Sequence, residues 1–93
     1  MADDKQYLMT HYKVDGTKSQ WFSRTMPSLE TLQQIVEGNI ELLWTSMSKG
    51  GQEGDNDIYG NEEALLLGMP LNKCFRTREW YGPLVRVKKV NKL

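Results

Sequence analysis

Five residues near the end of the chain combine cations with aromatic rings inside nine positions: Lys73, Arg76, Arg78, Trp80 and Tyr81. Arginine can engage phosphate through two parallel hydrogen bonds, and Trp and Tyr rings can stack on nucleobases. In an extended segment alternate residues share a face, which would bring Arg76, Arg78 and Trp80 together. The pattern predicts a site for a small anionic ligand, such as a nucleotide or a cyclic dinucleotide. The structural alternative is a core anchor at Trp80 with a solvated cationic edge that discourages strand pairing.

Residues for catalysis are sparse in this chain. His11 is the only histidine and Cys74 the only cysteine, and they stand 63 positions apart. A nucleophile and its base must meet in space beside a third, orienting group. Adjacent helix residues point about 100° apart, so Glu62 and Glu63 are interpreted as charges that favour a helix N-terminus. We therefore expect no enzymatic activity and no catalytic residue, with His11 structural or on the surface.

No group of residues indicates a metal ion or a cofactor. The chain has no His/Cys cluster, and Asp55-Asn56-Asp57 lacks the remaining ligands of a calcium loop. The sequence Lys49-Gly50-Gly51 lacks the strand and helix that flank a phosphate-binding loop. Cationic neighbours could make the Cys74 thiol reactive, but a lone cysteine beside Phe75 is more typical of a core.

The composition is that of one small domain covering residues 1–93. Apolar residues make up 39% of the chain and charged residues 26%, which is typical of a folded rather than a disordered chain. The single cysteine excludes an internal disulfide and favours a reducing, cytoplasmic setting. No apolar run approaches the roughly 18–20 residues of a membrane span, and the N-terminus is acidic rather than signal-like. We expect a cytoplasmic protein with no membrane partner.

The net charge of zero hides an uneven distribution. Residues 1–47 carry four Lys/Arg against six Asp/Glu, residues 48–71 one against five, and residues 72–93 seven against one. This pattern predicts separate acidic and basic surface regions. Alternatively, the basic terminal strand faces water and pairs with the acidic loop. Net neutrality makes binding to nucleic acid unlikely.

Alternating patterns and turn signals predict the first half of the chain. Residues 6–14 and 18–26 are expected to form a β-hairpin around Asp15-Gly16-Thr17. A helix is expected from its cap at Ser28 to a stop at Gly38. Residues 39–46 should then form a strand with Ile40, Leu42 and Trp44 on one face.

The second half is expected to contain a loop, a short helix and a closing strand. Residues 48–57 are rich in Gly and acids and read as a loop, and 58–60 as a short strand. Asn61 should cap a helix whose buried face is 64–67, ended by Gly68 and Pro70. Residues 79–90 should be extended. The predicted fold is α+β, of order β-β-α-β-(β)-α-β, with a mainly antiparallel sheet and one longer and one short helix packed on one face.

Three motifs carry a family resemblance: PSLETLQQIVEGNIELLW at 27–44, NEEALLLGMPLN at 61–72 and GPLVRV at 82–87. Through them the chain resembles a small family of uncharacterised domains from bacteria, plasmids and phages. The resemblance covers about residues 27–88. It implies the fold and an origin in a phage or other mobile element, and no catalytic residue. The chain departs from the family pattern at Ala64, where glycine is usual, and in the charged and aromatic insertion 74–81.

These observations favour a non-enzymatic binding module. The first hypothesis is a phage-type accessory or anti-defence protein of the host cytoplasm that captures a small anionic ligand through Lys73–Tyr81. The alternative is a protein–protein interaction module that regulates a host protein, or pairs with its own copy as a homodimer, through apolar surface around Trp21, Phe22 and Trp44. Binding to nucleic acid is the less favoured third hypothesis.

Overall fold

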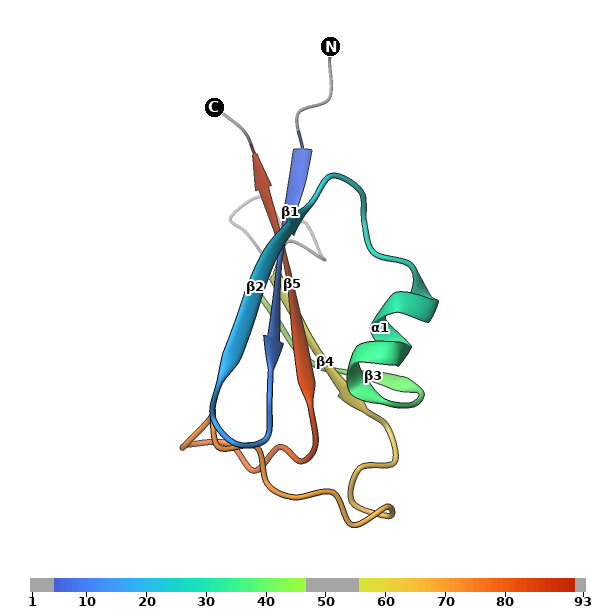
Figure 1. Cartoon of the computed structure of the whole chain (residues 1–93), viewed down its shortest axis with the longest axis vertical. Helices are drawn as coiled ribbons and strands as arrows, with labels where there is room; N and C mark the ends of the chain where they lie inside the picture. The colour runs from blue at the N-terminus through green and yellow to red at the C-terminus, as the bar shows by residue number, and fades with distance from the viewer. Residues whose placement is uncertain (1–4, 47–55, 92–93) are drawn as a thin grey trace.

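The described part of the chain folds as one five-stranded antiparallel sheet with a single helix across one face (Figure 1). The computed structural model describes residues 5–46 and 56–91. The strand order is β2-β1-β5-β4-β3, so the last strand lies in the centre of the sheet. The elements are β1 Lys5–Tyr12, β2 Lys18–Ser23, α1 Leu29–Val36, β3 Ile40–Ser46, β4 Asn56–Asn61 and β5 Leu84–Asn91. Among these described residues, no helix is long and apolar enough to cross a membrane.

The predicted hairpin is confirmed, because β1 and β2 pair antiparallel with Tyr12 opposite Lys18. The Asp15 carboxylate accepts hydrogen bonds from the backbone N–H of Thr17 at 3.0 Å and from its hydroxyl at 2.7 Å. Gly16 takes a φ of 99°, which suits glycine because it has no Cβ. β2 ends at Ser23, three residues before the predicted end at Met26.

The helix begins as predicted, since the Ser28 hydroxyl accepts from the backbone N–H of Thr31 at 3.1 Å. Its end differs from the prediction in one respect. The residue in the left-handed conformation is Glu37, with φ 66° and ψ 37°, and not Gly38. Gly38 serves another purpose: a Cβ on it would lie 2.5 Å from Nδ2 of Asn61. The glycine is therefore required by close packing against β4.

The predicted second helix is wrong. Residues 62–68 form consecutive turns with mixed spacing, in which the N–H groups of Ala64, Leu67 and Met69 bond to the carbonyls of Asn61, Glu63 and Ala64. The cap prediction holds locally, because Asn61 Oδ1 accepts from the N–H of Glu63 at 2.7 Å. Helices this short are marginal without an apolar face to bury, and Gly68, with φ 72°, ends the turns. Part of the predicted loop, residues 48–55, lies outside the described residues, and Asn56 and Asp57 belong to β4.

Two apolar clusters lie on opposite faces of the sheet. The helix packs Leu32 and Val36 on one face, on the cluster formed with Met9, Val85 and Val87. The cluster on the other face contains Tyr12, Ile58 and Leu84, with Leu43, Trp44, Cys74, Phe75 and Trp80 packed against it. The connection between β4 and β5, residues 62–83, lies across one end of the sheet (Figure 1). The second face is therefore covered by a connection rather than by a helix.

A β-bulge in β3 decides which side chains reach the second face. The pairing of β3 with β4 shifts between Leu42 and Trp44. Ile40 packs against the helix-side cluster, whereas Leu43 and Trp44 pack against the other one. The predicted common face of Ile40, Leu42 and Trp44 is therefore wrong, since a bulge adds one residue and reverses the alternation beyond it.

Candidate binding surface

The five residues singled out by the sequence all lie on the connection 62–83, but in different surroundings. Lys73 lies beside the β1–β2 turn, where its N–H donates to the Val14 carbonyl at 3.1 Å. Arg76 and Arg78 are exposed, and Trp80 and Tyr81 are half-buried. The structure brings Arg78, Trp80 and Tyr81 to one place and leaves Lys73 against the hairpin.

Trp80 belongs to a row of aromatic rings. Its ring centroid is 5.0 Å from that of Phe75, which is 4.8 Å from that of Tyr12, and both contacts are edge-to-face. An arginine covers each end of the row: Arg78 Cζ lies 5.3 Å from the Trp80 centroid, and Arg86 Cζ lies 5.9 Å from that of Tyr12. These are cation–π distances. The row ties the connection to the second apolar cluster.

Asn72 holds the connection in this position. Its side-chain N–H₂ donates to the carbonyls of Tyr12 at 3.0 Å and Gly82 at 2.9 Å, and its Oδ1 accepts from the N–H of Cys74. Its backbone N–H donates to the Trp80 carbonyl at 2.8 Å. The residue is fully buried, so these bonds also satisfy polar atoms that would otherwise be costly to bury. Asn72 therefore positions both Trp80 and Tyr81.

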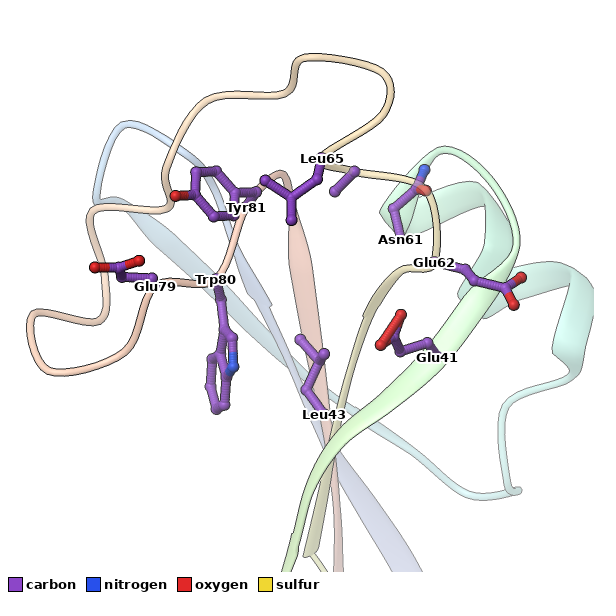
Figure 2. A pocket seen from close by; sticks show the side chains of 9 residues that line it. Glu41, Leu43, Asn61, Glu62, Leu65, Glu79, Trp80 and Tyr81 are labelled. Atoms are coloured by element: carbon purple, nitrogen blue, oxygen red, sulfur yellow. The ribbon is translucent and has the colours of Figure 1, made fainter.

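A cavity of about 220 Å³ opens beside Trp80 and Tyr81, as Figure 2 shows. Its apolar part comes from the bulged β3, from the turns after β4 and from the aromatic pair, and its charged part from three glutamates. Glu41 reaches toward the cavity, whereas Glu62 and Glu79 flank it on opposite sides and point outward. The lining residues are Glu41, Leu43, Asn61, Glu62, Ala64, Leu65, Glu79, Trp80 and Tyr81.

The charge of this cavity is the reverse of what the sequence suggested for Trp80 and Tyr81. Among the described residues that line it, the charged side chains are the glutamates Glu41, Glu62 and Glu79, and no lysine or arginine is present. Carboxylates repel phosphate and attract ammonium or guanidinium groups. An aromatic face beside them adds a further attraction for a cation. The cavity is therefore suited to a cation with an apolar stem.

Three consecutive leucines next to this cavity are exposed to solvent. Leu65, Leu66 and Leu67 are 72%, 86% and 60% exposed, and Leu71 is also exposed. The sequence predicted residues 64–67 to be the buried face of a helix, but only Ala64 is buried. Sequence reasoning missed this surface, although one signal was available: an unbroken leucine run has no polar face to turn toward water.

The only histidine and the only cysteine lie on opposite faces of the sheet. Cys74 packs with the second cluster, and His11 lines a different cavity on the helix side. Burial raises the pKa of the Cys74 thiol, Lys18 acts in the opposite direction and Asp15 in the same direction as burial, so the thiol is protonated near neutral pH. Within 5–46 and 56–91, no group of three or more His, Cys, Asp or Glu side chains is placed to hold a metal ion. The side chains of Cys74 and His11 are therefore separated by the sheet.

The fold and the surface define a small α+β sheet domain with a carboxylate-rimmed cavity beside an exposed apolar segment. The chain belongs to the family described as Domain of unknown function (DUF3846), whose model matches residues 9–91. This match confirms the predicted membership of an uncharacterised family and extends it through the first hairpin. No curated protein and no solved structure matches the chain.

Proposed function

We propose that this domain is a non-enzymatic binding module that captures a partner protein through residues 65–71 and the adjoining glutamate-rimmed cavity. The observation that carries the proposal is the exposure of Leu65, Leu66 and Leu67. Scattered exposed apolar residues are ordinary on folded monomers, whereas large contiguous apolar patches mark interaction sites. A domain of 93 residues has a small stability margin, so leaving three leucines in water favours a role that requires them there.

The cavity specifies the chemistry of the partner. Glu41 reaches into it, and Trp80 and Leu43 provide apolar contact. A lysine or arginine has this combination, since its apolar stem ends in a positive charge. We therefore expect a partner segment that places Lys or Arg next to apolar side chains. The leucines would pack on the apolar side chains of the partner segment. The glutamates would set the orientation of the partner and its association rate.

A small anionic ligand is the second candidate function. One observation favours it: the guanidinium of Arg78 lies against the Trp80 ring, with Arg76 exposed nearby in sequence. A nucleotide could stack on the outer side of this pair and place its phosphate on the arginines. It would have to bind outside the cavity, because the glutamates repel it. The family resemblance implies an origin in a phage or mobile element. By analogy with other small proteins of such elements, an accessory or anti-defence role in the host cytoplasm is part of the proposal and fits either ligand.

A peptide-display selection on the full chain tests the leading proposal. Enriched sequences should contain Lys or Arg flanked by apolar residues. In fluorescence polarisation, the enriched peptide should bind at least about tenfold more weakly to Leu66→Ser and to Glu41→Gln. Leu29→Ser is the matched control, because Leu29 is an exposed leucine on α1, outside this surface. Enrichment of acidic sequences, or equal binding by Leu66→Ser, would contradict the proposal.

Two further measurements separate the alternatives. Thermal stabilisation by a cyclic dinucleotide, lost in Arg78→Gln, would favour the anionic ligand; at 100-fold excess over Kd the gain should be about 2.7 kcal/mol. Sedimentation at several concentrations tests for a dimer. If a dimer forms and Leu66→Ser dissociates it, the partner is a second copy of the chain.

A further inference from the structure

A second cavity lies on the helix side of the sheet and shares Met69 and Pro70 with the segment 65–71 described above. Its volume is about 310 Å³, at the lower end of the range of ligand pockets, about 300–1,000 Å³. It is formed where the end of β1, the C-terminus of α1 and two parts of the connection 62–83 meet. The lining residues are His11, Lys13, Val14, Glu37, Met69, Pro70 and Pro83.

The walls of this cavity are held together by backbone hydrogen bonds. Lys73 N–H donates to the Val14 carbonyl at 3.1 Å, and Gly82 N–H donates to the Pro70 carbonyl at 2.8 Å. Met69 is packed so closely that a Cβ on Gly82 would lie 2.6 Å from its sulfur. Two prolines add rigidity to the walls. The cavity is therefore formed before any ligand arrives, which lowers the entropic cost of binding.

The lining divides into an apolar part and three polar groups. Val14, Met69, Pro70 and Pro83 supply the apolar part. The polar groups are the cation of Lys13, the anion of Glu37 and the imidazole of His11. Burial lowers the pKa of His11, Lys13 lowers it further and Glu37 acts in the opposite direction. Both charges therefore act on the imidazole, which is neutral near pH 7 and able to donate one hydrogen bond.

Glu37 occupies a backbone conformation that favours glycine. It is the only non-glycine residue with a positive φ in the described part of the chain. Its left-handed conformation at the end of α1 is that of the residue that is usually glycine at a helix terminus. A glutamate there is less stable than a glycine by about 1 kcal/mol on general grounds of backbone strain. Strained residues of this kind cluster at binding sites, and this one places a carboxylate at the rim of a preformed cavity.

We propose that this cavity binds a small zwitterion with an apolar body, the chemistry of a free apolar α-amino acid such as leucine or methionine. The ligand ammonium group is held by the Glu37 carboxylate, its carboxylate by the Lys13 ammonium with His11 donating beside it, and its side chain lies against Met69 and the prolines. The site shares Met69 and Pro70 with the segment 65–71 of the proposed partner surface, so it adds a ligand input next to the binding surface of the module.

Titration of the full chain with three compounds tests the proposal. L-leucine has both charges, 4-methylpentanoate lacks the ammonium and 3-methylbutylamine lacks the carboxylate. Binding is followed by NMR at the His11 ring and the Met69 methyl group. Leucine should bind more tightly than either analogue, and its affinity should fall about tenfold or more in Glu37→Gln and in Lys13→Met. Glu37→Gln should leave the affinity for 4-methylpentanoate unchanged. Lys13→Met should leave the affinity for 3-methylbutylamine unchanged.

Two matched controls lie outside the cavity. Glu30 is in the first turn of α1, at the far end of the helix from Glu37, and Lys18 is opposite Tyr12 on the second face of the sheet. Glu30→Gln and Lys18→Met should bind leucine like the unchanged chain. Absence of leucine-dependent shifts at His11 and Met69 would overturn the proposal, as would equal losses in the control variants.

Glu37→Gly separates a ligand role from a structural one. Glycine adopts the left-handed conformation without strain, so this variant should melt at a higher temperature while losing leucine binding at least about tenfold. Full leucine binding by Glu37→Gly would overturn the proposal. A Glu37→Gly chain that is no more stable than the unchanged chain would also overturn it, because the glutamate would then serve the fold.

Discussion

The side-chain amide of Asn61, at the end of β4, donates to the backbone carbonyl of Glu37 at 3.1 Å, where α1 ends in a left-handed turn. The same N–H₂ group donates to the Val36 carbonyl, also at 3.1 Å. The last carbonyls of a helix have no partner within the helix, so Asn61 satisfies them from the sheet. One asparagine thus ends β4, caps the turns that follow and closes the C-terminus of α1.

Substitution of Asn61 should destabilise the domain, and aspartate should be worse than alanine. Asn61→Ala leaves buried carbonyls unsatisfied, for an expected loss of about 2–4 kcal/mol in the free energy of unfolding. Asn61→Asp retains the acceptor for Glu63 but brings a negative charge beside the carbonyls of Val36 and Glu37. Urea denaturation measures both losses. Asn39→Asp, at an exposed position, should change stability by less than about 0.5 kcal/mol; an Asn61→Asp chain more stable than Asn61→Ala would contradict this account.

Gly82 and Gly68 should respond differently to alanine, although both have positive φ values, 80° and 72°. Gly68 has nothing within 4 Å of an added Cβ, so Gly68→Ala should cost only the backbone strain, about 1 kcal/mol. At Gly82 the added Cβ would also clash with Met69, and the loss should exceed that of Gly68→Ala by about 1–3 kcal/mol. Thermal unfolding of the two variants gives the comparison. Adding Met69→Ala to Gly82→Ala should reduce the difference in stability loss between the two glycine variants. Equal stability losses for Gly68→Ala and Gly82→Ala would rule out the clash.

Asn72→Ala should loosen the connection 62–83 before it affects the hairpin. The variant loses the bonds to Tyr12, Gly82 and Cys74, at an expected cost of about 2–4 kcal/mol. Native-state hydrogen exchange should accelerate first at the Gly82 amide, which bonds to Pro70 across the connection. Amides between β1 and β2 are the internal control. Uniform acceleration in both regions would show that the connection does not open independently.

The stability of the domain should fall in alkali through Tyr59. Burial raises the pKa of Tyr59 to about 12, and the charge of Asp57 and its hydrogen bond from the phenol act in the same direction. The unfolded phenol titrates near 10, so between about pH 10 and 12 the unfolded chain binds fewer protons than the folded one and stability decreases as pH rises. Below pH 10 this contribution is fully present.

Denaturation at several pH values checks the effect, with the phenol followed by ultraviolet difference absorbance. Tyr59→Phe should remove the transition near pH 12 and flatten the loss of stability above pH 10. Tyr7→Phe, at a half-buried position on β1, is the matched control and should leave that transition in place. A pH dependence that is unchanged by Tyr59→Phe would assign the loss to other groups.

Neither cavity could be predicted in full from the sequence, because each joins residues from distant parts of the chain. The sequence placed Trp80 and Tyr81 among the cations that neighbour them along the chain. In the structure their cavity is completed by Glu41 from β3 and Glu62 from the turns after β4, neither of which is close in sequence. The second cavity likewise joins His11, Glu37 and Pro83. Such groupings depend on the strand order of the sheet, which places β5 between β1 and β4.

Local structure and family membership could both be predicted from the amino-acid sequence. Turn chemistry at Asp15–Thr17 and the cap at Ser28 each act within a few residues, and each predicted its element. The motif around Asn61 and Asn72 identified the family. These signals are readable because capping and turn formation involve neighbouring residues.

Three features could not be predicted from local sequence: the bulge before Trp44, the left-handed conformation of Glu37 and the absence of a helix at 62–68. The first two depend on contacts between distant residues, β3 with β4 and Asn61 with the end of α1. The third follows from the exposure of Leu65–Leu67, which the described part of the chain leaves uncovered. Local preferences amount to about 1 kcal/mol or less per residue, which packing contacts readily exceed. The exposed leucines and both cavities are consequences of that packing.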